Sequence, residues 1–198
     1  MKKMFFTLAC LLAPVSFHAQ NNSCVIPGKG HLQIHVGTGG LLGAFAHDHL
    51  IEAQKIEGCV RLDAKDPTQS SLRLVFPASG IRVLDPSESA KDRATVQQTM
   101  ETEVLRVSEF PQITFESTGI VRAGGPNQYH VKGNLKIRDK IQPAEIPVTF
   151  TQNADGTYEA VGKYNFKQTG FGIKPVQVAG GTVKVKDEIQ TDFDLFLK

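Results

Sequence analysis

The residues of this chain that best suit metal or head-group chemistry are two histidines in the segment His47-Asp48-His49. Side chains two positions apart in an extended strand point to one face, so both imidazoles can reach one ion. His31 and His35 lie four positions apart, so they also share one face of a strand and could join the first pair if the hairpin closes. They alternate with aliphatic residues, however, and are expected on the outside of the fold. Three interpretations stay open for His47 and His49: a zinc, copper or haem site, solvent-facing loop histidines, or contacts with a ligand head group.

The three cysteines have different settings. Cys10 lies within an apolar N-terminal run, and its removal with that run would leave Cys24 and Cys59. An oxidising compartment permits a disulfide between them, and a hairpin centred near Gly43 would bring the two stretches side by side. Spacing alone does not establish that they are close enough, so a disulfide and two free thiols are both open.

The sequence contains few motifs typical of catalysis or of nucleic-acid binding. The chain has no Gly-x-Ser-x-Gly motif, and no cysteine sits in a pattern typical of a nucleophile with its base. The segment Gly37-Thr38-Gly39-Gly40 lacks the Lys-Ser/Thr that completes a phosphate loop. With 22 Lys+Arg against 20 Asp+Glu, the formal charge of +2 is too balanced for a nucleic-acid surface. We expect no enzyme, no cofactor and no nucleic-acid partner.

The N-terminus has the composition of a secretory signal peptide. Lys2 and Lys3 precede a mostly apolar stretch from Met4 to Val15, which is too short to span a bilayer comfortably. We expect residues 1–19 to be removed after Ala19 and residues 20–198 to form one periplasmic or secreted domain; an uncleaved anchor is the alternative. No later apolar run is long enough for a membrane span.

The sequence around these residues predicts β-strands. From Tyr129 to Ile137 apolar or small residues alternate strictly with polar ones, so one face of this strand packs on a core and the other meets water. Similar patterns and their breakers define eight strand candidates: His31–Gly37, His49–Asp63, Ser70–Leu84, Gln112–Arg122, Gln128–Arg138, Ala144–Asn153, Thr157–Gln168 and Thr182–Leu197.

One helix is expected between the strands, from Pro86 to Val104, with Asp85 as N-cap and a narrow apolar stripe that packs over the sheet. Eight antiparallel strands lose their edges by closing into a barrel, which can be filled or can hold one small ligand. Small residues on the expected inner face either leave volume for a ligand or relieve strand bending: Ser117, Gly119, Gly133, Ala160 and Gly162.

Four segments in a fixed order resemble the YceI-like family of exported polyisoprenoid-binding proteins: Phe110–Thr118, Tyr129–Arg138, Pro147–Phe150 and Gly170–Ile173. The resemblance covers nearly the whole chain after residue 19. It implies an all-β, eight-stranded antiparallel lipocalin-like barrel with an apolar lipid, typically a polyprenyl chain, threaded into its interior. It also implies a periplasmic or secreted location.

Candidate lining residues are large apolar side chains on the expected inner faces, together with the residues of the first hairpin. The same apolar residues would also make an ordinary filled core, in which case the barrel would act as a protein-interaction module. We expect the ligand to contact the following residues: Phe45, His47, His49, Phe76, Ile113, Phe115, Leu135, Ile137, Phe150, Tyr164, Phe166 and Phe171.

Overall fold

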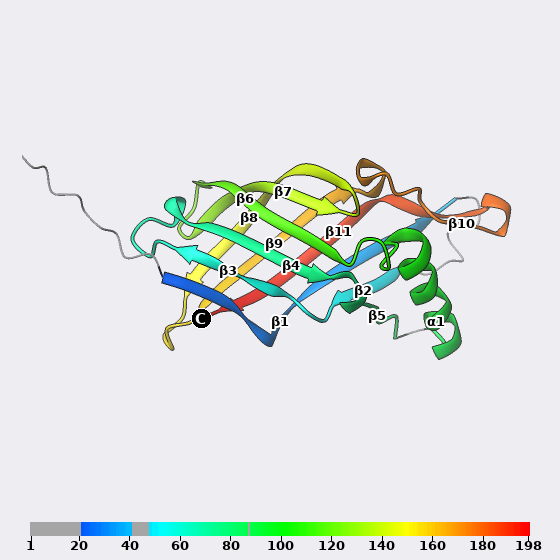
Figure 1. The fold of residues 1–198 in the computed structure, drawn as a ribbon, viewed down its shortest axis with the longest axis horizontal. Helices are drawn as coiled ribbons and strands as arrows, with labels where there is room; N and C mark the ends of the chain where they lie inside the picture. Colours follow the sequence, from blue (N-terminus) through cyan, green and yellow to red (C-terminus); the bar gives the residue numbers. More distant parts are fainter. Residues whose placement is uncertain (1–20, 41–47, 87) are drawn as a thin grey trace, which may run out of the picture.

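The structure is a computed structural model that describes residues 21–40, 48–86 and 88–198. It is a single antiparallel sheet that curls into a barrel, with one helix at one end (Figure 1). The strands are β1 (Asn21–Gly39), β2 (His49–Ala53), β3 (Glu57–Leu62), β4 (Ser71–Pro77), β5 (Ile81–Val83), β6 (Gln112–Arg122), β7 (Gln128–Ile137), β8 (Lys140–Gln152), β9 (Tyr158–Lys167), β10 (Gln177–Val178) and β11 (Val183–Leu197). The helix is α1 (Ala90–Thr99), which continues into a π turn, Met100–Val104. Short 3-10 turns cover Pro67–Gln69, Ala78–Gly80, Gln168–Phe171 and Ala179–Gly181.

β1 closes the barrel. It pairs with β11 along most of its length, and its first residues also pair with β3, as in Cys24 opposite Cys59. The remaining strands follow in the order β3, β4, β6, β7, β8, β9, β11. The expected closed eight-stranded antiparallel barrel with one helix is therefore confirmed.

Two of the expected strands are each divided in two. His49–Asp63 forms β2 and β3, and Ser70–Leu84 forms β4 and β5. The breaks lie side by side, since the N–H of Gln54 donates to the carbonyl of Gly80 at 3.0 Å. On the side of the breaks that faces α1, β2 pairs with the second half of β1, and β5 pairs with β2. These three paired segments extend from the barrel wall to α1 (Figure 1).

Three expectations about local structure are wrong. The strand expected to begin at Ala144 begins at Lys140, after a two-residue turn in which Arg138 has a φ of +58°. Pro143 is tolerated within β8 because β9 pairs with β8 only from Val148 onward. On the β9 side, Pro143 therefore has no neighbouring strand that needs a backbone N–H. The helix begins at Ala90 rather than Pro86, and its N-cap is Ser89, whose side chain accepts from the N–H of Asp92.

The third correction concerns the inner face of β6. Its pairing with β7 shifts register between Ser117 and Gly119, which is a β-bulge. Every side chain beyond the bulge changes face, so Ile120 points into the barrel and Val121 is 43% exposed. Gly119, expected inside, lies opposite the exposed Lys132 on the outer face.

The inward glycines do not leave empty volume at their own positions. A Cβ atom on Gly133 would lie 2.5 Å from the Phe115 ring, and one on Gly162 would lie 2.5 Å from the Phe193 ring. Each glycine is therefore covered by an aromatic ring of a neighbouring strand. Among the residues that the structure describes, no helix is both long and apolar enough to cross a bilayer.

Candidate ligand cavity and histidine cluster

A cavity of about 220 Å³ occupies the inside of the barrel. Its wall includes Pro67, which follows β3, and Ile81 of β5, next to α1. Figure 1 shows these two regions at opposite ends of the barrel, so the cavity follows the barrel axis.

Eight of the predicted contact residues line this cavity: Phe76, Ile113, Phe115, Leu135, Ile137, Phe150, Tyr164 and Phe166. Phe171 does not line it. Its ring packs edge-on against Phe166, with centroids 5.5 Å apart, in a separate cluster with Ile137 and Ile173. Phe45 and His47 lie outside the described residues.

Sequence reasoning missed several lining residues. The alternation in β11 already placed Phe193, Leu195 and Leu197 on one face, and that signal was sufficient to find them. Ile120 could not be found in this way, because its direction depends on the β6 bulge.

The cavity wall is almost entirely hydrocarbon. None of the described residues that line it carries a charge. The aliphatic hydroxyls at the wall form local hydrogen bonds, since Thr191 donates to the carbonyl of Tyr164 at 2.8 Å and Ser70 accepts from the N–H of Asp63. Burial raises the pKa of the Tyr164 phenol above its ordinary value, which keeps this group neutral. Such a wall favours an apolar guest.

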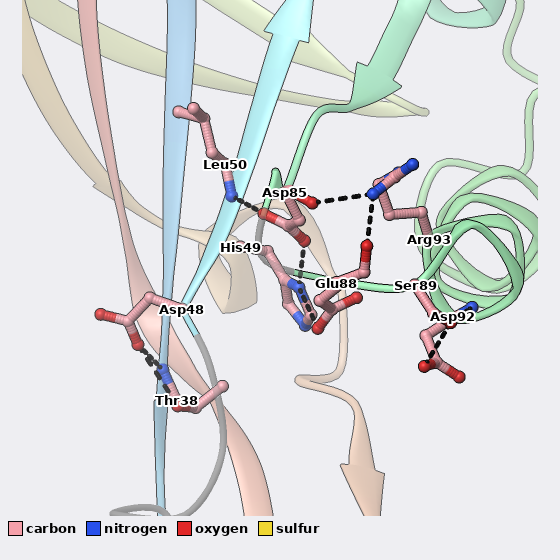
Figure 2. A network of polar contacts seen from close by, with 9 residues as sticks. All are labelled: Thr38, Asp48, His49, Leu50, Asp85, Glu88, Ser89, Asp92 and Arg93. Atoms are coloured by element: carbon pink, nitrogen blue, oxygen red, sulfur yellow. Dashed lines mark hydrogen bonds and ion pairs between the residues drawn. The ribbon is translucent and has the colours of Figure 1, made fainter.

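His49 lies apart from this wall, next to α1. Its Nδ1 is 2.7 Å from Oδ2 of Asp85 and 3.9 Å from Oε1 of Glu88 (Figure 2). The second Asp85 oxygen accepts from the N–H of Leu50. Asp85 is therefore a partner of β2 and not the helix cap that its position before Pro86 suggested.

The pairing of β2 with β5 explains this contact. Ile51 lies opposite Val83, so continuing the same antiparallel register places His49 opposite Asp85. The contact between His49 and Asp85 could not be predicted from the sequence, because it depends on how β2 pairs with β5.

His31 and His35 do not join His49. Both lie on the outside of β1, His31 half-buried and His35 exposed, and their Nε2 atoms lie 3.3 Å and 2.7 Å from the carboxylate of Asp192. His35 pairs opposite Leu50 whereas His49 pairs opposite Val36, so His35 and His49 point to opposite faces. His31 and His35 therefore do not form a metal site together with His49.

Cys24 and Cys59 are joined by a disulfide, which links β1 to β3. The bridge therefore holds the first part of β1, the strand that closes the barrel, against the neighbouring strand β3.

The comparisons with known proteins agree with this architecture. The sequence is 26% identical over 159 residues to a UPF0312 protein of Pectobacterium atrosepticum, which covers 80% of this chain and 68% of that protein. The fold is similar to the crystal structure of BcnA from Burkholderia cenocepacia, with a TM-score of 0.69, 23% identity, and coverage of 87% and 98% of the two chains. It is also similar to a polyisoprenoid binding domain from Saccharophagus degradans, with a TM-score of 0.64, 9% identity, and coverage of 91% and 99%. Because residues 29–197 match the model of the YceI-like domain, this chain belongs to the YceI-like family.

Proposed function

We propose that this protein binds an apolar lipid of the polyisoprenoid class inside its barrel and carries or sequesters it without chemical change. The observation that supports this most directly is the uncharged, hydrocarbon wall of the axial cavity. The similarity to a polyisoprenoid binding domain supports the choice of lipid class.

The energetics of such binding need no special polar contact. Each buried methylene contributes about 0.8 kcal/mol, so ten of them give roughly 8 kcal/mol before the entropy losses of binding. A free energy of that size corresponds to a dissociation constant near 1 μM. A wall made of side chains such as Phe115, Leu135 and Phe193 is sufficient to provide it.

The absence of charged groups from the described cavity wall also favours carriage over catalysis. General acid–base chemistry needs a titratable group within hydrogen-bond reach of the bound molecule. The titratable groups at the wall are phenols, and the pKa of Tyr164 is raised further from neutrality by burial.

We further propose that residues 1–19 are a signal peptide and that residues 20–198 act in the periplasm or outside the cell. The charge and apolar run at the start of the chain support export. The Cys24–Cys59 disulfide supports it independently, because such bridges persist in oxidising compartments.

Native mass spectrometry of the protein purified from its own host tests this proposal. We expect a stoichiometric apolar species that organic extraction releases and identifies as a polyprenyl lipid. The protein mass also reports whether residues 1–19 are removed.

A matched pair of variants on β9 links the ligand to the cavity. Ala160 lines the cavity, whereas the next residue, Val161, is 43% exposed on the outside. We expect Ala160→Phe to fill the cavity and lose the lipid, and Val161→Phe to retain it. A wild-type protein that arrives bare and takes up no added polyprenyl lipid would contradict the proposal, as would equal retention by both variants.

A further inference from the structure

We propose that His49, Asp85 and Glu88 form a binding site for one divalent zinc ion, separate from the lipid cavity. These three side chains offer one imidazole nitrogen and two carboxylate oxygens that all lie within 4.8 Å of one another. They come from the start of β2, the segment after β5 and the residue before the N-cap of α1 (Figure 2). None of the three lines the axial cavity.

The distances between the donor atoms suit a small tetrahedral ion. With zinc–ligand bonds of about 2.0–2.2 Å, neighbouring donor atoms in a tetrahedral site lie about 3.4 Å apart. The distance from His49 Nδ1 to Asp85 is 2.7 Å and that to Glu88 is 3.9 Å, which lie on either side of this value. The two carboxylate oxygens lie no more than 4.8 Å apart, so side-chain movements on the order of 1 Å bring all three atoms to bonding distance.

The burial of the two carboxylates indicates that a positive ion belongs here. The Asp85 side chain is 3% exposed and that of Glu88 is 13% exposed. Oε2 of Glu88 is fully buried and has no hydrogen-bond partner among the residues that the structure describes. A buried carboxylate with an unpartnered oxygen is costly, and a cation bound to the same carboxylate offsets part of that cost.

The nearby guanidinium of Arg93 does not neutralise the two buried carboxylates. Arg93 of α1 donates to the main-chain carbonyls of Asp85 and Glu88 rather than to their carboxylates (Figure 2). Its contacts hold the backbone of the two acids in place, while Leu50 orients Asp85 through its N–H. Metal ligands are commonly fixed in this way by an outer layer of hydrogen bonds.

The donor set selects the kind of metal. Calcium takes six to eight oxygen ligands and magnesium keeps most of its waters, whereas an imidazole with carboxylates suits zinc. His49 would bind through Nδ1 as its Nε2–H tautomer, so the ion replaces the proton between His49 and Asp85. Its imidazole retains 17% exposure, which leaves a route from solvent.

Isothermal titration of the purified, chelator-treated protein with Zn²⁺ tests the site. We expect one ion per chain, and Co²⁺ in its place should give the visible absorption of a tetrahedral complex. Glu88→Gln should weaken Zn²⁺ binding at least about tenfold without harming the fold, because the Oε2 it alters has no partner.

Two controls separate this site from surface binding. Asp92→Asn alters an exposed carboxylate at the start of α1, and the double variant His31→Gln/His35→Gln removes the exposed pair beside Asp192. Both should bind Zn²⁺ like the wild type. No binding by the wild type, unchanged binding by Glu88→Gln, or loss of binding in the His31/His35 variant would overturn the proposal. Circular dichroism of each variant establishes that it is folded.

Discussion

The side-chain amide of Gln97 in α1 pairs with the main chain of Val83 in β5, as a neighbouring strand would. The N–H of Val83 donates to Oε1 of Gln97 at 2.9 Å, and Nε2 of Gln97 donates to the carbonyl of Ile81 at 2.9 Å. β5 is an edge strand that pairs only with β2 in the described sheet. The helix thus covers an edge that would otherwise expose unpaired backbone groups.

We expect Gln97→Ala to lower the free energy of unfolding by about 1–3 kcal/mol, because the N–H of Val83 loses its side-chain acceptor and the carbonyl of Ile81, which also accepts from the Arg82 guanidinium, loses one donor. Urea denaturation measures this loss. Gln98→Ala on the exposed side of the same helix is the matched control and should change stability by less than about 0.5 kcal/mol. Equal effects of the two substitutions would show that the pairing with β5 contributes nothing.

Removing the disulfide should destabilise the barrel. The bridge joins residues 35 positions apart, and the loop-entropy relation gives about 4 kcal/mol for a loop of that length. We expect Cys24→Ser/Cys59→Ser to unfold at lower denaturant concentration, and a reductant should have the same effect on the wild type but none on the variant. Two free thiols in the purified, oxidised protein would contradict this prediction.

Tyr164 should make stability fall at alkaline pH. Burial raises the pKa of its phenol in the folded state, so the fold favours the neutral form. This contribution is complete below the ordinary tyrosine pKa of about 10 and is lost as the pH rises through the raised value. Thermal unfolding across this range measures it. Tyr164→Phe should flatten the alkaline fall, and an unchanged profile in that variant would assign the fall to other groups.

Asp187 should contribute a small loss of stability in acid. Its carboxylate accepts from the N–H of Thr169 at 2.9 Å and from the Thr169 hydroxyl at 2.8 Å, and these hydrogen bonds lower its pKa. Stability from this group is complete above the ordinary aspartate pKa and is lost as the pH falls through the lowered value. Asp187→Asn should remove this component of acid unfolding, whereas Thr169→Val, which keeps the backbone donor, should remove only part of it. Nuclear magnetic resonance titration that finds an ordinary pKa for Asp187 would refute this assignment.

Strand patterns predicted the barrel because alternation is a local property. The side chains of β7 from Tyr129 to Ile137 alternate as expected, with Tyr129, Val131 and Ile137 buried. The errors arose where the answer depends on a partner far along the chain. The bulge in β6 is defined only against β7, and the breaks after β2 and β4 meet each other in space.

For the same reason, the sequence predicted only one member of the group formed by His49, Asp85 and Glu88. His49 stood out by its spacing from His47, but Asp85 resembled a helix cap because it precedes Pro86. Only the pairing of β2 with β5 shows that Asp85 faces His49, while Ser89 takes over the capping of α1. The register of two short strands therefore decided both the role of Asp85 and the position of the helix start.

The two covered glycines have a consequence for ligand size. Phe115 and Phe193 both border the cavity, and each ring tip rests where a side chain on Gly133 or Gly162 would stand. A methyl group on Gly133 would also lie 2.5 Å from the main-chain oxygen of Glu116, and one on Gly162 would lie 2.6 Å from that of Pro147, so either would displace backbone as well as a ring. The two missing side chains therefore leave room for the Phe115 and Phe193 rings at the cavity wall, and an alanine at either position would distort the part of the wall that bounds the ligand space.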